Sequence, residues 1–231
     1  MSDILAQKQL KKWREDPAQM IRDLFDTEPD DWQKDICDVF PTHQRIAMQA
    51  CKGPGKTAVM AMLVWNFLLT RPHPKVVCTS ITGDNLADGL WAELAKWQKK
   101  SPLLTEAFEW QKQRVFLKEH PETWFASART WPDDGSAEQQ ANTLAGIHAD
   151  YVLFVIDEVG GIPDAVMAAA AARAPFDGIC LGVDLAICST HGSLSSENSR
   201  AGITDEYPTC RATGCRWGPE HSSASCAPRA S

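Results

Sequence analysis

Apolar residues recur at helical spacing in the first part of the chain and predict an N-terminal helix. Over residues 4–24 they lie on one helical face, at Ile4, Leu5, Leu10, Trp13, Met20, Ile21 and Leu24. We assign residues 1–25 to this helix. After a turn, Asp30 or Asp31 caps a second short helix, which ends at Phe40 because a proline follows.

Strand-like and helix-like segments then alternate up to residue 158. Short apolar runs that predict strands lie at 46–48, 75–80, 114–118 and 123–127. The stretches 58–69 and 86–97 carry apolar residues at helical spacing. The run 151–156 is apolar throughout, which is typical of a parallel strand covered on both faces. We therefore predict an α/β domain over residues 26–173, with a mostly parallel central sheet flanked by helices.

The composition changes after Arg173. No lysine occurs after Lys118, and serine, cysteine, glycine, arginine and proline dominate the remainder. No helical or strand period persists beyond Cys188, and such a composition cannot easily bury a core. We therefore expect residues 174–231 to form a poorly ordered tail, either disordered or translated out of frame.

Length and charge narrow the class of protein. A chain of 231 residues accommodates one α/β domain and an extension. Its net charge of −7 argues against a generic basic nucleic-acid-binding protein. No apolar run is long enough to cross a bilayer, and the N-terminus has no apolar secretory segment. We expect a cytoplasmic protein without a membrane partner.

A glycine-rich loop separates the first predicted strand from the helix at 58–69. It reads Ala50-Cys51-Lys52-Gly53-Pro54-Gly55-Lys56-Thr57. Strand, glycine-rich loop and helix in this order form a triphosphate site, because backbone N–H groups and the helix start face the anion. In such a loop Lys56 reaches the β- and γ-phosphates, and the Thr57 hydroxyl ligates Mg²⁺. The loop departs from the usual pattern only at Ala50, where a glycine is typical.

Asp157 and Glu158 follow the apolar run 151–156 and complete the predicted chemistry. Parallel sheets bind ligands at the carboxyl ends of their strands, so an acidic pair there faces the phosphate loop. We expect Asp157 to hold Mg²⁺, usually through water, and Glu158 to polarise the water that attacks the γ-phosphate. Acidic pairs are common on protein surfaces, so Asp157-Glu158 alone would be a weak signal. Together with the phosphate loop, the pair predicts nucleotide hydrolysis.

Several segments together resemble the ATPase domain of tailed-phage terminase large subunits. They are Trp32-Gln33, the phosphate loop, Val76–Ser80, Leu86–Trp91, Leu144–Ala149 and Ile156–Asp164, within about residues 20–173. The resemblance implies a P-loop NTPase fold of the catalytic-glutamate type, with ATP and Mg²⁺ as cofactors. It also implies ATP-driven packaging of double-stranded DNA into a prohead, in the bacterial host cytoplasm. Portal protein and terminase small subunit are the implied partners, and a homo-oligomer is an open alternative to a monomer.

The resemblance also suggests roles for single residues, besides Lys56 and Glu158 as the catalytic pair. Gln33 corresponds to a glutamine that reads adenine, with Trp32 packed nearby; the alternative is a helix start with a buried tryptophan. Lys52 corresponds to an early basic residue of the loop. His148 lies where the family often has a histidine, for which we expect a structural or capping role. Arg129 is either an arginine that contacts the γ-phosphate, in cis or in trans, or a surface arginine.

In the family's sheet, a further strand that ends in a coupling motif lies between the phosphate-loop strand and the Walker B strand. Here it must fall within Ile179–Cys188, followed by Ser189-Thr190-His191. Gly182 and Asp184 interrupt that run, and both are unfavourable in a strand buried on both faces. Few residues remain for the family's nuclease domain, so we expect an incomplete, truncated motor domain.

Three other interpretations stay open. A helicase-like ATPase shares the same core, although no second helicase domain is recognisable. A non-catalytic remnant would keep the loop without turnover. In the tail, Cys210, Cys215, His221 and Cys226 have a zinc-like spacing that matches no standard zinc site.

Overall fold

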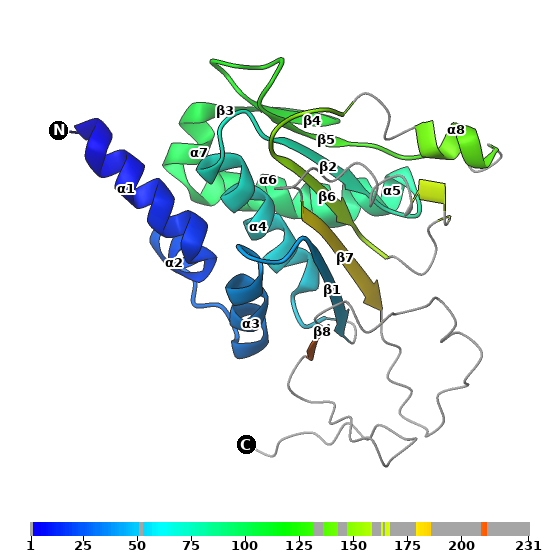
Figure 1. The fold of residues 1–231 in the computed structure, drawn as a ribbon, viewed down its shortest axis with the longest axis horizontal. Coiled ribbons are helices and arrows are strands. Elements are labelled where there is room, and N and C mark those ends of the chain that lie inside the picture. Colours follow the sequence, from blue (N-terminus) through cyan, green and yellow to red (C-terminus); the bar gives the residue numbers. More distant parts are fainter. Residues whose placement is uncertain are drawn as a thin grey trace, which may run out of the picture.

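A computed structural model of the chain describes residues 2–50, 53–131, 136–142, 147–158, 163, 165–166, 179–185 and 209–211. Helices and strands alternate along these ranges (Figure 1). The helices are α1 (Ser2–Glu15), α2 (Pro17–Phe25), α3 (Asp31–Val39), α4 (Lys56–Thr70), α5 (Gly83–Leu86), the π-helix η1 (Ala87–Trp91), α6 (Ala92–Lys100), α7 (Pro102–Ala107) and α8 (Ala137–Asn142). The strands are β1 (Arg45–Ala50), β2 (Lys75–Thr79), β3 (Phe108–Gln111), β4 (Arg114–Leu117), β5 (Phe125–Ala128), β6 (Val152–Ile156), β7 (Ile179–Leu185) and β8 (Thr209–Arg211).

The strands form one sheet in the order β3-β4-β5-β2-β6-β7-β1-β8. From β5 to β8 every neighbouring pair is parallel, whereas β3, β4 and β5 pair antiparallel at one edge. The prediction of a mostly parallel α/β sheet is therefore confirmed. Since the parallel strands all point the same way, their carboxyl ends share one edge, at which the phosphate loop and the acidic pair both begin.

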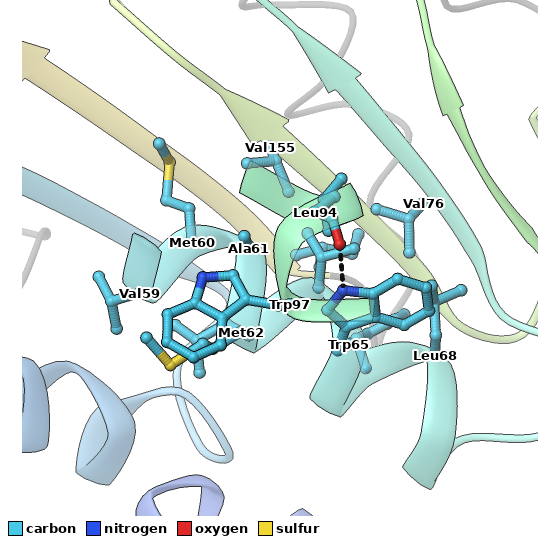
Figure 2. Close-up of a cluster of buried hydrophobic side chains, with 14 of the residues drawn as sticks. Val59, Met60, Ala61, Met62, Trp65, Leu68, Val76, Leu94, Trp97 and Val155 are labelled. Carbon is cyan, nitrogen blue, oxygen red and sulfur yellow. Dashed lines mark hydrogen bonds between the residues drawn. The ribbon is translucent and has the colours of Figure 1, made fainter. Parts of the chain in front are cut away.

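Helices cover one face of the sheet, and α4 lies at the centre of that layer. Every residue of α4 from Val59 to Leu68 is buried, because the helix lies between the sheet and the outer helices α1, α2 and α6. Figure 2 shows this core: Trp65 donates its indole N–H to the Leu94 carbonyl at 3.1 Å, with Val76 and Val155 of the sheet nearby. The bond satisfies the one polar atom of a fully buried tryptophan.

The opposite face of the sheet has its own smaller apolar cluster. It contains Val77 of β2 and three alternate residues of β6, namely Val152, Phe154 and Ile156. Trp131, Ile147 and Val166 cover them from outside the sheet. Burial of β6 on both faces confirms the interpretation of its unbroken apolar sequence.

The N-terminal region forms two helices, so the prediction of one helix over residues 1–25 was wrong. Pro17 has no N–H and cannot continue α1, but it suits the first turn of a new helix. The Asp16 carboxylate caps that turn by accepting from the Gln19 backbone N–H at 2.9 Å. The sequence pattern of apolar residues survives the break, because both helices pack against the same core.

Asp23 holds α1 and α2 together. Its carboxylate accepts hydrogen bonds from Trp13 Nε1 at 2.8 Å, Gln9 Nε2 at 3.0 Å and Gln19 Nε2 at 2.7 Å. The bond from Trp13 is the main cause of a lowered pKa of Asp23, against a smaller opposing effect of burial. All three donors favour the ionised carboxylate.

We expect the contribution of Asp23 to stability to be lost in acid. A carboxyl group whose pKa is lower in the folded chain than in the unfolded chain stabilises the fold at pH values above the unfolded pKa, near 4. This stabilisation is lost as the pH falls through the folded pKa. Asp23→Asn should therefore lower the melting temperature at pH 7 by roughly 2 °C, since the group is exposed, and by less at pH 2. Thermal melts of the wild type and Asp23→Asn between pH 7 and pH 2 test this expectation. Asp35→Asn, which changes an exposed residue of α3, is the control. A deficit that persists unchanged at pH 2 would contradict it.

Beyond residue 173 the structure contains two strands of the same sheet. β7 pairs with β1 on one side and β6 on the other, which is the place predicted for the coupling strand. Gly182 pairs with Ala47 and Ile156, while Asp184 lies beyond the last paired residue of β6 and pairs only with Gln49. The ladder uses backbone groups, so Gly182 does not prevent it, and Asp184 lies at the carboxyl edge rather than in the middle of the sheet.

The second of these strands, β8, corrects the expectation that no strand follows Cys188. It pairs in parallel with residues 47–49 of β1. Without it β1 would present a row of unpaired backbone groups at the sheet edge. The sheet thus extends past the boundary predicted at 173. Ser189-Thr190-His191 and the rest of the tail lie outside the described residues.

No helix in the part of the chain that the structure describes has the length and apolarity required to cross a bilayer.

Candidate functional site

The phosphate loop connects β1 to α4 at the carboxyl edge of the sheet. Gly53 and Gly55 have φ angles of +93° and +92°, a left-handed conformation that glycine adopts without strain. Gly55 is the N-cap of α4, and its carbonyl accepts the first helical bond from Val59 N–H at 3.1 Å. The strand, loop and helix predicted from the sequence are thus present; Cys51 and Lys52 lie outside the described residues.

Lys56 and Thr57 are the first two residues of α4, and both are half-buried. The start of a helix leaves backbone N–H groups without helical partners and carries a partial positive charge. An anionic group placed here would meet these N–H groups, the Lys56 ammonium and the Thr57 hydroxyl. The geometry is that of a phosphate site.

Gln33 joins α3 to the phosphate loop. Its Oε1 accepts from the Asp30 backbone N–H at 3.0 Å, within a capping box, and its Nε2 donates to the Gly55 carbonyl at 3.4 Å. Only 7% of Gln33 is exposed, and Trp32 beside it lies in the hydrophobic core. Both ends of the amide are therefore engaged with backbone. A nucleotide base that used this amide would have to replace those two bonds.

The contact between Gln33 and Gly55 makes the second loop glycine sensitive to substitution. A Cβ on Gly55 would lie 2.9 Å from Gln33 Nε2, whereas a Cβ on Gly53 would meet no described atom within 4 Å. Both alanine variants carry the cost of a left-handed residue, about 1–2 kcal/mol. We expect Gly55→Ala to weaken nucleotide binding about tenfold more than Gly53→Ala, measured by fluorescent-nucleotide titration.

A double variant separates the steric cause from the backbone cause. Gln33→Ala removes the amide that a Cβ on Gly55 would touch, so part of the affinity lost through Gly55→Ala should be restored when both proteins compared carry Gln33→Ala. Equal losses in Gly53→Ala and Gly55→Ala, with no restoration, would show that the contact with Gln33 is unimportant.

Asp157 and Glu158 follow β6 at the same edge. The Asp157 backbone N–H donates to the Thr79 carbonyl at 2.9 Å, which extends the ladder between β6 and β2 by one residue. Its half-buried carboxylate has a raised pKa, mainly because burial disfavours the charge and also because Glu158 is close. The Lys56 ammonium and the Glu158 backbone N–H act in the opposite direction but do not cancel the effect. Lys56 and Asp157 are therefore near enough to interact, as a common site requires.

Glu158 has a φ angle of +61°, a left-handed conformation that is uncommon for a residue with a side chain. Its Oε2 accepts a hydrogen bond from Asn85 Nδ2 at 3.2 Å. Asn85 lies in α5, directly after β2, in a turn capped by the Thr82 hydroxyl. A carboxylate has further lone pairs, so this single donor orients Glu158 and leaves it able to accept a proton.

Sequence reasoning did not identify Asn85. The available signal was its position: a polar side chain in the first turn after a central strand lies at the same sheet edge as the acidic pair. What the sequence could not supply was which side chain of that turn reaches Glu158, because residues 85 and 158 meet only in the folded sheet.

We expect Asn85→Ala to slow ATP turnover about tenfold while nucleotide affinity stays the same, because a loosened general base is less often in position. Steady-state kinetics that separate kcat from KM test this. Asp84→Ala, which changes the neighbouring exposed residue, is the control. An unchanged kcat in Asn85→Ala would show that the hydrogen bond does not position the glutamate.

The oxygen atoms at this site suit Mg²⁺. The Thr57 hydroxyl and the Asp157 carboxylate are hard oxygen ligands of the kind this ion prefers. Burial and Glu158 together oppose the charge on Asp157 more than Lys56 supports it, so a further cation would be stabilised there. These residues fit the metal that the sequence predicted.

Two other candidates lie farther from the loop. Arg129 follows β5 and donates its backbone N–H to the Cys78 carbonyl at 2.9 Å. Since β2, β6 and β7 separate β5 from β1, Arg129 follows a strand about 19 Å across the sheet from the phosphate-loop strand but only about 10 Å from β6, and its contact with the γ-phosphate stays a prediction. His148 precedes β6 at the opposite edge, where its carbonyl accepts from Lys75 Nζ at 2.7 Å, which favours a structural role.

Of the four residues with zinc-like spacing, only Cys210 lies within the described residues, so the zinc interpretation stays untested. Cys210 belongs to β8, and Cys215, His221 and Cys226 lie outside the described ranges. Across the ranges that are described, no three histidine, cysteine or acidic side chains form a metal-binding group.

The loop, the acidic pair and the strand order define a P-loop NTPase fold. One strand, β7, lies between the loop strand β1 and the acidic strand β6, which is the order expected from the resemblance to terminase ATPase domains.

Comparison with solved structures assigns this fold more narrowly. The large terminase ATPase domain of Thermus phage P74-26 has a TM-score of 0.54 at 18% identity, covering 84% of this chain and 84% of that domain. A mutant of the same domain has a TM-score of 0.55 at 19% identity, and the match covers 86% of this chain and 87% of that domain. No protein-family model and no curated protein matches the sequence. The chain has the fold of phage large terminase ATPase domains, which confirms the predicted fold class.

Proposed function

We propose that this chain is an ATP-hydrolysing motor domain of the large terminase type. One observation carries the proposal: the phosphate loop and the Asp157–Glu158 pair lie at one sheet edge, with Lys56 close enough to influence the Asp157 carboxylate. A loop alone would only bind phosphate. An added acidic pair, one member of which is oriented by Asn85, supports hydrolysis.

Each residue then has a distinct role. Backbone N–H groups of Gly53 to Thr57 and the Lys56 ammonium bind the β- and γ-phosphates of ATP. Thr57 and Asp157 hold Mg²⁺, which neutralises phosphate charge when bound. Glu158 accepts a proton from the attacking water.

Gln33 of α3 recognises the adenine base of ATP. Gln33 can donate and accept along one base edge, and its present bonds to Asp30 and Gly55 link base binding to loop conformation. Trp32 supports α3 from the core rather than by stacking. Lys52 adds positive charge to the loop.

The fold also suggests the context in which ATP is used. Solved structures with this fold include ATPase domains of phage large terminases. By that likeness we propose double-stranded DNA as the translocated substrate, with portal protein and terminase small subunit as partners, in the bacterial host cytoplasm. β7 occupies the position through which such a domain would couple the loop to the acidic strand.

Nucleotide-dependent thermal protection tests the core of the proposal. ATP with Mg²⁺ at one hundred times its Kd should stabilise the full chain by about 2.7 kcal/mol, a shift of several degrees. Phosphate release should accompany binding. No shift with any nucleoside triphosphate would support a non-catalytic remnant instead, and a shift without phosphate release would restrict the function to binding.

A further inference from the structure

Gly89 lies in an unusual part of the helix that follows β2. Residues 87–91 form the π-helix η1, between α5 and α6. Such segments are rare and occur frequently at functional sites. Glycine is less favourable than alanine inside a helix, so Gly89 lowers the stability of this helical segment. A structural or functional reason for the glycine is therefore expected. Its backbone gives no reason, because Gly89 does not have a positive φ.

The reason is found in what Gly89 faces. A Cβ built on Gly89 would lie 3.6 Å from Asp157 Oδ2. No other described heavy atom outside its own helix and its chain neighbours lies within 4 Å of that position. A methyl group would therefore fit in ordinary contact with the carboxylate, and no further described residue outside the helix borders the space that it would occupy.

A water molecule that binds the Asp157 carboxylate could use that space. A water bound to Oδ2 lies about 2.8 Å from it, and a methyl group 3.6 Å from the same oxygen removes one direction of approach. Mg²⁺ retains several of its waters in proteins and is commonly held by only one or two carboxylates. Ser80, the residue directly after β2, has a fully buried hydroxyl for which the described residues offer no hydrogen-bond partner. It directly follows Thr79, whose carbonyl accepts from the Asp157 N–H.

We propose that Gly89 is a positioning residue of the metal site: its missing side chain keeps open the space for water between η1 and Asp157, through which the carboxylate holds hydrated Mg²⁺. This inference rests on the proposed function, since it assumes that Asp157 binds the metal. It assigns to the π-helix a task that no motif in the sequence indicates.

Two glycines of the same helical segment give a matched test. Gly89→Ala places a methyl group against Asp157, while a Cβ on Gly83 would meet only Thr130 Cγ2, at 3.8 Å. Thermal protection by ATP is measured across a Mg²⁺ titration, and Mn²⁺ binding is followed by electron paramagnetic resonance. Gly89→Ala should need about tenfold more metal, as outer-sphere changes commonly cause. Its ATP binding in EDTA and its ligand-free melting temperature should not fall.

The outcomes separate the two proposals. Wild-type protein without metal-dependent ATP binding would overturn both. Normal binding in the wild type with an unchanged metal requirement in Gly89→Ala, or an equal change in Gly83→Ala, would overturn the role of Gly89 alone. Gly89→Ser offers a hydroxyl in place of the displaced water and should recover part of the affinity. A serine variant as weak as the alanine variant would overturn the role of water, and this variant decides the question if Gly89→Ala folds poorly.

Discussion

Lys56→Ala should abolish measurable ATP binding at micromolar nucleotide and reduce kcat/KM by about 10³-fold or more. Lys56 is the first residue of α4, half-buried and close enough to Asp157 to lower its pKa. Removing one member of a desolvated charge pair costs about 2–5 kcal/mol in binding, and loss of transition-state stabilisation adds to this. Isothermal titration and phosphate-release kinetics measure the two parts.

The same substitution at Lys99 is the matched control. Lys99 is exposed in the last turn of α6, so Lys99→Ala removes an equal charge without touching the loop. Lys56→Ala should also raise the pKa of Asp157 further, since the nearby positive charge that lowers this pKa is gone. ATP binding that survives in Lys56→Ala would remove the phosphate site from the proposal.

Glu158→Gln should separate binding from hydrolysis. The amide keeps the shape of the side chain but cannot accept a proton at neutral pH, so turnover should fall by about 10²–10⁴-fold. Nucleotide affinity should stay within a few-fold of wild type, because Glu158 is assigned to water activation and not to phosphate binding. Single-turnover kinetics with bound ATP give the chemical step directly.

Glu106→Gln, on the exposed face of α7, controls for loss of a carboxylate elsewhere. If Glu158→Gln hydrolyses ATP at the wild-type rate, another group is the base. Equal loss of binding and turnover would indicate instead that the variant disturbs the adjacent Asp157.

The sequence predicted the parts of the fold that local pattern controls. The phosphate loop has fixed spacing and glycines with positive φ, and β6 is apolar because both of its faces are buried. The break between α1 and α2 also has a local sequence signal, Asp16-Pro17, but the apolar period continues across it. Pro17 ends one helix and begins the next despite this continuity.

Contacts made by tertiary structure could not be predicted in the same way. The hydrogen bond from Asn85 to Glu158 joins residues separated by 73 positions, and the approach of Gly89 to Asp157 depends on a π-turn without a sequence signature. β7 was placed correctly by family resemblance, while its composition argued against a strand. Pairing on both sides outweighed the low strand preference of Gly182, because ladder bonds do not depend on the side chain.

Helix α4 has one more consequence for a motor. Its 15 residues form a rod about 22 Å long, with the phosphate loop at its first turn. Near the other end, fully buried Asn66 donates to the Trp13 carbonyl of α1 at 2.7 Å. A packed helix moves as a unit, so any displacement of the first turn of α4 would be transmitted through this bond to α1.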